Sequence, residues 1–214
     1  MELGEFYGFV IRHGETPDNE AGIARGISNI GLAPVGIKQA YEDAEALRNQ
    51  KIDTLRVSKL ERSKHHGKII GKILGIQPIF TDRLDTLDIG DLTKQPDEKI
   101  AKEVARLSAD KPGEKFPNGQ SFNEWAFKIW PEVHLFFIYI RSGRHPADVT
   151  HGRLTNVIQA LVKGDCRYLD RDTLRKPPTQ KNGEIYAVSF RDGKYYYEKF
   201  FAPSQETQKR KGSV

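Results

Sequence analysis

The hydrophobic and polar positions change period several times along the chain, and each change marks the border of a predicted element. Residues 6–11 form a short, almost continuous apolar run, which is typical of a strand buried on both faces of a sheet. After a polar loop, apolar residues recur at helical spacing from Pro34 to Leu47 and predict an amphipathic helix. The alternation continues with a strand near 54–57, a helix over 62–75 and a strand over 76–80.

The second half of the chain carries signals of the same kind. Ser121 and Glu124 form a capping-box pattern, which predicts the start of a long helix. Four aromatic residues of this segment are expected in the core: Trp125, Trp130, Phe136 and Phe137. A short strand that ends at Thr150, a further helix and a hairpin around Asp192 and Gly193 complete the predicted order.

Strands that alternate with helices predict a mostly parallel sheet covered on both faces, which is a three-layer α/β/α sandwich. Sheets of this kind bind ligands beyond the carboxyl ends of their strands. Two of the predicted strands are followed by similar short motifs, Arg12-His13 and His151-Gly152. We therefore expect two histidines and an arginine to converge at one edge of the sheet and to form an anion site that contains a nucleophile.

Composition narrows the class of protein. With 214 residues and 37% hydrophobic content, the chain can bury one sizeable core, which we assign to a single domain over residues 1–202. Cys166 is the single cysteine, so no intrachain disulfide can form and a reducing compartment is expected. The N-terminal segment lacks the pattern of a secretory signal, and no window approaches the roughly 18 apolar residues of a membrane span. The sequence therefore predicts a cytoplasmic protein with no membrane partner.

The net charge of +5 does not by itself indicate a nucleic-acid partner. Part of the excess lies in residues 203–214, where Lys209, Arg210 and Lys211 are consecutive, and we expect this segment to be a disordered basic tail. Charges of both signs are interspersed elsewhere, as on an ordinary solvated surface. The pattern favours a small anionic substrate over nucleic acid and leaves the oligomeric state open.

The segment RHGETPDN at 12–19 resembles the signature of the histidine phosphatase superfamily, also called the phosphoglycerate mutase-like family. The resemblance continues in the same order through GISNIGLAPVGIKQA (26–40), SKLERS (58–63), PNGQSFNEW (117–125) and VTHGR (149–153). Together these motifs extend over most of residues 6–190. The resemblance implies a phosphoglycerate mutase-like fold and a phosphohydrolase that cleaves a small phosphomonoester through a phosphohistidine intermediate. It implies neither a metal ion nor a cofactor.

The resemblance also gives each matching residue an implied role. His13 is the implied nucleophile, because a neutral imidazole nitrogen can attack a phosphoryl group in line. Arg12 and Arg62 are the implied donors to the phosphoryl oxygens, since planar, permanently charged guanidinium groups match phosphate. His151 is the implied second histidine of the phosphate cradle. The remaining implied contacts to the substrate or to the residues around it are Asn19, Thr16, Glu15 and Gly152.

The general acid is the point at which the sequence departs from the family. The segment RLDTLDIGDLT has Thr86 at the position where most members carry a glutamate, and threonine cannot serve as a general acid. Asp88, which precedes Gly90, is the favoured replacement, and Asp85 and Asp82 are further candidates on the same loop. A carboxyl group in this role needs a raised pKa.

Two alternative functions stay open. The first is a mutase of the phosphoglycerate type, although the chain lacks the longer insertion that we expect in cofactor-dependent mutases between Gly90 and Pro117. The second is a catalytically silent module that keeps the anion pocket for binding, which Thr86 and Gln120 would fit. The presence of both arginines and both histidines of the motif favours an enzyme.

The other histidines carry no catalytic signal. His65 and His66 are adjacent, so on a helix they point about 100° apart and do not form an i, i+4 metal pair. We expect both to be surface or cap residues.

Overall fold

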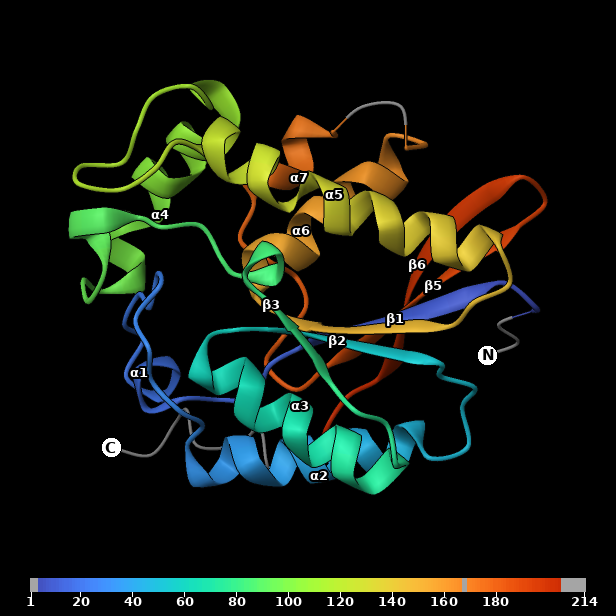
Figure 1. The fold of residues 1–214 in the computed structure, drawn as a ribbon. Helices are drawn as coiled ribbons and strands as arrows, with labels where there is room; N and C mark the ends of the chain where they lie inside the picture. The colour runs from blue at the N-terminus through green and yellow to red at the C-terminus, as the bar shows by residue number, and fades with distance from the viewer. Residues whose placement is uncertain (1–3, 167–168, 205–214) are drawn as a thin grey trace.

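A six-stranded sheet forms the centre of the protein in a computed structural model that describes residues 4–166 and 169–204 (Figure 1). The strand order is β3-β2-β4-β1-β5-β6. The strands are β1 (Tyr7–Arg12), β2 (Thr54–Ser58), β3 (Ile79–Thr81), β4 (Pro146–Thr150), β5 (Ile185–Arg191) and β6 (Lys194–Phe201). The pairs β1–β4, β2–β4 and β2–β3 are parallel, whereas β5 is antiparallel to both β1 and β6. The prediction of a mostly parallel sheet is confirmed.

Helices cover both faces of this sheet, as predicted for a three-layer sandwich. The helices are α1 (Pro17–Glu20), α2 (Pro34–Leu47), α3 (Glu61–Leu74), α4 (Asp97–Ala105), α5 (Phe122–Arg141), α6 (Gly152–Lys163) and α7 (Arg171–Arg175). Single-turn segments are η1 (Asp82–Leu84), η2 (Gly90–Leu92) and η3 (Arg106–Asp110). Helices α2 and α3 lie on one face, and α5 and α6 lie on the other (Figure 1). No helix of the described ranges is long and apolar enough to cross a membrane.

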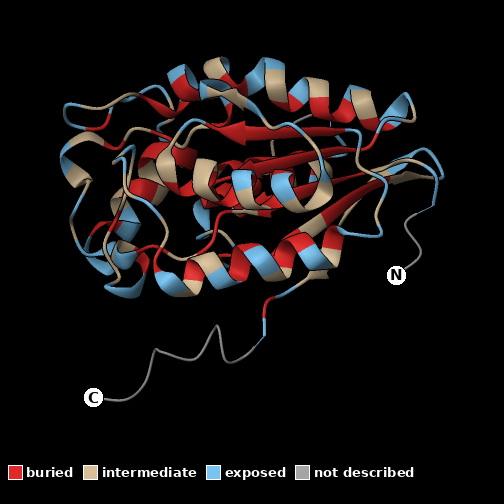
Figure 2. Cartoon of the chain, turned by 60° about the horizontal axis from the view of Figure 1, so that its bottom comes forward, coloured by how far each residue is buried: buried red, intermediate tan, exposed pale blue. Residues whose placement is uncertain are grey.

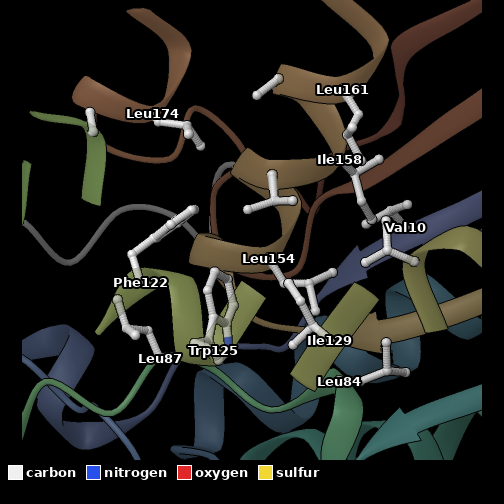
Figure 3. Close-up of a cluster of buried hydrophobic side chains, with 14 of the residues drawn as sticks. Val10, Leu84, Leu87, Phe122, Trp125, Ile129, Leu154, Ile158, Leu161 and Leu174 are labelled. Carbon is white, nitrogen blue, oxygen red and sulfur yellow. The ribbon is translucent and has the colours of Figure 1, made fainter. Parts of the chain in front are cut away.

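The sheet divides the interior into two apolar clusters, which explains the continuous apolar run of β1. Phe9 and Ile11 belong to the cluster under α2 and α3, whereas Val10 belongs to the cluster under α5 and α6. Successive side chains of a strand point to opposite faces, so a strand buried on both sides needs apolar residues at every position. The helices are buried toward the sheet and exposed on their outer faces (Figure 2), and Trp125 and Ile129 pack against Leu154 and Ile158 in the second cluster (Figure 3).

The local sequence signals agree with the structure at most positions. Ser121 and Glu124 form the predicted capping box at the start of α5, and Gly75 ends α3 with a φ of 70°. One aromatic prediction was wrong: Trp130 is 47% exposed and stacks on His134 on the outer face of α5. The reason is register, because the buried seam of α5 leaves this position on the opposite side of the helix.

The C-terminal boundary of the domain lies slightly beyond the predicted residue 202. The backbone and hydroxyl of Ser204 both donate to the carboxylate of Glu42 on α2. The remainder of the predicted basic tail, 205–214, lies outside the described residues.

A buried ion pair joins the sheet to α5. Arg56 on β2 donates to both carboxylate oxygens of Asp148 on β4, at 2.8 and 2.6 Å, and to Glu132 on α5 at 2.9 Å. The side chains of Arg56 and Asp148 are 4% and 1% exposed. The loss of one partner would leave a charge in the interior with incomplete compensation.

We predict that Asp148→Ala lowers the free energy of unfolding by about 3 kcal/mol or more, the usual cost of breaking a buried pair from one side. Urea denaturation at pH 7 measures this. Glu45→Ala is the matched control, because the Glu45–Arg48 pair is exposed and such pairs contribute at most about 1 kcal/mol. Equal losses in the two variants would contradict the prediction.

Candidate active site

The carboxyl ends of three neighbouring strands bring the predicted site residues together. Arg12 at the end of β1 is in register with Thr150 at the end of β4, and the backbone N–H of His13 donates to the carbonyl of Thr150. His13 and His151 therefore follow adjacent strands, and their ring centroids are 5.0 Å apart. Helices α2 and α6 lie on opposite faces of the sheet (Figure 1), so this edge is a switch point of the kind at which α/β sheets bind ligands. A pocket of about 550 Å³ lies here and is lined by Arg12, His13 and His151.

The ring of His13 is oriented by its own neighbour. Its Nδ1 lies 2.8 Å from the carbonyl oxygen of Gly14, and because a carbonyl can only accept, Nδ1 carries the proton and donates. The lone pair of the neutral ring is then on Nε2. Burial lowers the pKa of His13 well below its ordinary value, and the nearby His151, Arg62 and Arg12 lower it further. His13 is thus a neutral imidazole whose free nitrogen can act as a nucleophile at neutral pH.

Two guanidinium groups adjoin this imidazole, and neither pairs with a carboxylate of residues 4–166 or 169–204. Arg12 donates to the carbonyl of Gln180 at 2.7 Å, and its Nε is buried with no hydrogen-bond partner in the described chain. Arg62, at the start of α3, donates to the carbonyls of Gly26 and Ser28 at 2.8 and 2.6 Å. Burial is the largest cause that lowers the pKa of Arg12 to about 10 and that of Arg62 to about 9. Both stay charged at pH 7, so the site holds excess positive charge that an anion would neutralise.

His151 is held by a chain of hydrogen bonds. Its Nδ1 accepts from Nε of Arg62 at 3.3 Å, so the ring proton is on Nε2, which donates to the hydroxyl of Ser58 at 2.7 Å. Ser58 in turn donates to Asp85 at 2.6 Å. Burial lowers the pKa of His151 well below its ordinary value, and Arg62 is the next largest cause. His151 is therefore neutral in this arrangement, with an acidic group two hydrogen bonds away.

Gly152 allows Arg12 to lie against the N-terminus of α6. A Cβ atom at this position would be 3.1 Å from Cζ of Arg12, so a larger residue would displace the guanidinium group. The first turn of α6 offers backbone N–H groups and a positive dipole end to an anion. Gly152 and Arg12 both line the pocket.

A buried pair lies behind the nucleophile loop. The backbone N–H of Gly14 donates to Nδ1 of His66 at 2.9 Å, and Nε2 of His66 lies 3.0 Å from a carboxylate oxygen of Asp43 on α2. The distance to Asp43 is that of a hydrogen bond, but the two groups are poorly aligned for one. Both side chains are fully buried; burial lowers the pKa of His66 to about 3 and raises that of Asp43 well above its ordinary range. Burial therefore favours the uncharged form of both side chains.

The prediction that His66 is a surface or cap residue was wrong; His65 beside it is partly exposed. His66 lies on the face of α3 that meets α2 and the loop after β1. Neither Asp43 nor His66 belongs to a motif, and they are 23 positions apart in the sequence. Only the packing of α2 against α3 reveals their relation to Gly14.

Of the four residues predicted to contact the substrate, Gly152 lines the pocket, and the other three lie outside its lining. Thr16 and Asn19 bond to each other in the capping box of α1, and both side chains are buried outside the lining of the pocket. The amide of Asn182 donates to the carbonyl of His13 at 2.9 Å and lies 3.4 Å from the side-chain oxygen of Asn19. The charge of Glu15 acts to raise the pKa of Arg12. These side chains support the nucleophile loop, whereas Gly152 faces the pocket.

None of the three aspartates that the sequence offers as general acid lines the pocket. Asp88 accepts from the backbone N–H of Gly90 at 2.9 Å and does not line the pocket. Asp85 is bonded to Ser58, and the exposed Asp82 pairs with Lys128. Thr86, by contrast, does line the pocket.

Several pocket residues were not found from the sequence. Ala24 pairs with Gln95 through a backbone hydrogen bond, which joins the loop after α1 to the start of α4. This contact brings Arg25 and Asp97 to the rim, where their side chains are 3.6 Å apart. Further lining residues are Leu87, Ile89, Ile100, Val104 and Arg153. No motif marks these positions, because loops brought together by tertiary contacts carry no common pattern. In the described chain no three His, Cys, Asp or Glu residues lie together in a way that could hold a metal ion.

A neutral histidine with a free ring nitrogen, two guanidinium groups and a helix N-terminus lie together at the carboxyl edge of the α/β sheet, and this is an arrangement suited to binding a phosphoryl group. The sequence profile of the histidine phosphatase superfamily (branch 1) matches residues 9–202. The chain belongs to this superfamily.

Individual relatives agree with this assignment. The chain is 28% identical over 160 residues to a protein named probable phosphoglycerate mutase GpmB of Yersinia pestis, an alignment that covers 73% of this chain and 74% of that protein. The fold matches a mycobacterial glucosyl-3-phosphoglycerate phosphatase with a TM-score of 0.74 at 19% identity, over 91% of this chain and 98% of the other. It also matches the alpha-ribazole phosphatase of Shigella flexneri with a TM-score of 0.69 at 19% identity, over 90% and 95% of the two chains.

We predict that His66→Leu lowers kcat, by up to about 100-fold, because it removes the acceptor of the Gly14 N–H and lets the nucleophile loop shift. KM should change little, since the phosphate donors stay in place. His66→Asn is the matched rescue: its side-chain oxygen occupies the position of Nδ1 and can accept the same hydrogen bond. Steady-state kinetics, with folding checked by circular dichroism, decides between the two. Equal kcat values for the two folded variants would show that this hydrogen bond does not matter.

Proposed function

We propose that this protein is a phosphomonoesterase that works through a phosphohistidine intermediate on His13. One observation carries the proposal: a neutral imidazole with a free Nε2 lies beside two guanidinium groups that have no carboxylate partner among the described residues. A phosphate monoester dianion would supply the missing negative charge and place its phosphorus near the nucleophile. This arrangement suits phosphoryl transfer, in which positioning and charge stabilisation supply most of the catalysis.

In the first step, Nε2 of His13 attacks phosphorus, and the bond from phosphorus to the ester oxygen breaks. The leaving oxygen takes the electron pair of that bond and acquires a proton. Arg12, Arg62 and the first turn of α6 stabilise the charge on the equatorial oxygens. In the second step, water attacks phosphorus and the bond from phosphorus to Nε2 breaks, so its electron pair returns to the ring. The group that protonated the leaving oxygen takes a proton from this water, and inorganic phosphate leaves the neutral histidine.

His151 changes state in this scheme. A bound phosphate dianion competes for Nε of Arg62 and favours a protonated His151, because a nearby negative charge raises the pKa of an imidazole. The proton on Nε2 of that ring is hydrogen-bonded to Ser58, which donates to Asp85, so the carboxylate of Asp85 stabilises the protonated ring. His151 would then donate to the phosphoryl group from Nδ1.

The leaving group takes its proton from Asp97 in the proposed scheme. Asp97 is the acidic side chain among the pocket-lining residues of the described chain, whereas Asp88 is bonded to the backbone of Gly90. Asp97 lies at the rim of the pocket, 3.6 Å from the guanidinium group of Arg25, and in this scheme it is the carboxyl group that reaches the leaving oxygen.

The relatives favour two reactions that share the first step. The name phosphoglycerate mutase suggests return of the phosphoryl group to a second hydroxyl group, and the names of the structural neighbours suggest hydrolysis. We favour hydrolysis because the segment between Gly90 and Pro117 is short. We also place the enzyme in the cytoplasm, on the sequence evidence of a single cysteine. Exchange of label between positions of phosphoglycerate tests the mutase.

His13→Ala should abolish phosphate release from p-nitrophenyl phosphate and trapping of an acid-labile, base-stable phosphoenzyme. In the described site, His13 is the only histidine that has a free ring nitrogen and lies beside both Arg12 and Arg62, and the variant removes it. Denaturing gel analysis after incubation with a ³²P-labelled substrate measures the intermediate. A near-normal rate in the folded variant would rule out the proposed nucleophile.

Asp97→Asn should slow an alkyl phosphate by about 100-fold or more and an aryl phosphate far less, since an aryl leaving group hardly needs a proton. Asp88→Asn is the control, because Asp88 is the general acid that the sequence favours. The asparagine oxygen can still accept from the backbone N–H of Gly90, but the side chain can no longer act as an acid. A selective loss for alkyl phosphates in Asp88→Asn, and not in Asp97→Asn, would return the role to Asp88.

A further inference from the structure

The pocket contains more positive charge than the transferred phosphate requires. Beyond the phosphate site, its lining includes the cationic residues Arg25, Arg153, Arg175 and Lys176. Arg25 is near Asp97 at 3.6 Å, and Arg175 pairs with Asp110 at 2.9 Å and with Asp172. These two arginines have counter-charges within the described chain.

Arg153 has none. Its closest hydrogen-bond contact is a long one of 3.4 Å to the carbonyl of Leu174, and it forms no ion pair in the described ranges. Arg153 is half-buried in the pocket wall, and burial lowers its pKa to about 10, so the side chain is charged at pH 7. A partly desolvated charge gains from an opposite charge that joins it.

The position of Arg153 limits what can supply that charge. It follows Gly152 directly in the first turn of α6, and Gly152 packs against the guanidinium group of Arg12. Arg153 therefore starts next to the phosphate site, and its side chain lines the same pocket and reaches toward the carbonyl of Leu174. Lys176 lines the same pocket, is exposed and has no ion-pair partner in the described chain, and it adds to the positive potential there.

Part of the pocket lining is apolar. Leu87, Ile89, Ile100 and Val104 line it, and all four are buried residues of the second core cluster. A substrate body held between this surface and Arg153 would gain from apolar burial on one side and from charge pairing on the other.

We propose that Arg153 forms a second anion subsite, and that the substrate is a phosphomonoester with a largely apolar body and a second anionic group, either a carboxylate or a phosphate. The guanidinium fork suits both groups. This inference rests on the proposed function for the identity of the first phosphate.

Matched aryl phosphates test the subsite. We would compare kcat/KM for the three positional isomers of carboxyphenyl phosphate with that for the corresponding carbamoylphenyl phosphates, which have the same shape and no charge. Phenylene bisphosphates test whether a second phosphate group can take the place of the carboxylate. The neutral carbamoyl group withdraws electrons more strongly than the carboxylate, so intrinsic leaving-group reactivity works against the expected preference.

At least one anionic isomer should be preferred by about 10- to 100-fold, the usual contribution of a hydrogen bond to a charged group. In Arg153→Gln this ratio should fall close to one, and Arg153→Lys should keep part of it. Arg83→Gln is the control, because Arg83 is exposed outside the pocket and its loss changes the net charge equally. A ratio near one in the native protein for every isomer, or a ratio that survives in Arg153→Gln, would overturn the subsite.

Binding separates this inference from the proposed reaction. Calorimetry with carboxyphenyl and carbamoylphenyl phosphonates needs no turnover, so the subsite is tested even if no substrate is hydrolysed. An anionic preference without phosphate release from any aryl phosphate would support the subsite and contradict the phosphatase. Phosphate release with no anionic preference would do the reverse.

Discussion

The hydrogen bond from Nδ1 of His13 to the carbonyl of Gly14 is the constraint on which the site depends. It fixes the tautomer, so the lone pair lies on Nε2 and the ring needs no separate base. The bond requires the chain after β1 to turn sharply against α2. Gly14 and Gly36 permit this, since a Cβ on Gly14 would lie 2.4 Å from the carbonyl oxygen of Gly36. His66 holds the same residue from behind, because its Nδ1 accepts from the backbone N–H of Gly14.

The second constraint is electrostatic, and it works with the first. Two guanidinium groups beside an imidazole lower its pKa, as burial does, so the nucleophile stays neutral well below the ordinary titration range of histidine. The same positive charge has no carboxylate partner among the described residues and would attract the dianion of the proposed reaction. One arrangement therefore keeps the nucleophile active and binds the substrate, which explains why Arg12 and Arg62 donate to carbonyl groups rather than to carboxylates.

The parts of the molecule that follow local rules could be predicted from the sequence. The apolar run of β1, the capping box of α5 and the glycine that ends α3 all depend on neighbouring residues, and the family motifs mark His13 and His151 directly. The third strand was predicted too long, and Trp130 was placed in the core because a composition argument ignores its helical register. Asp43, His66 and Arg153 could not be found, because each acquires its surroundings from elements distant in the sequence.

The site has two parts, one at strand ends and helix starts and one in loops, and this explains how one phosphate-binding arrangement can serve different substrates. The phosphate donors and the nucleophile lie at strand ends and helix starts, whose positions the two cores fix. The rest of the pocket comes from loops joined by a few contacts, such as that between Ala24 and Gln95, and loops change more freely than cores. Arg153 is part of α6, so the core fixes its position in the same way, but its side chain lines a pocket whose other walls come from loops. Selectivity for a second anion would therefore be positioned as firmly as the catalytic residues, even though the surrounding loops set the shape of the substrate.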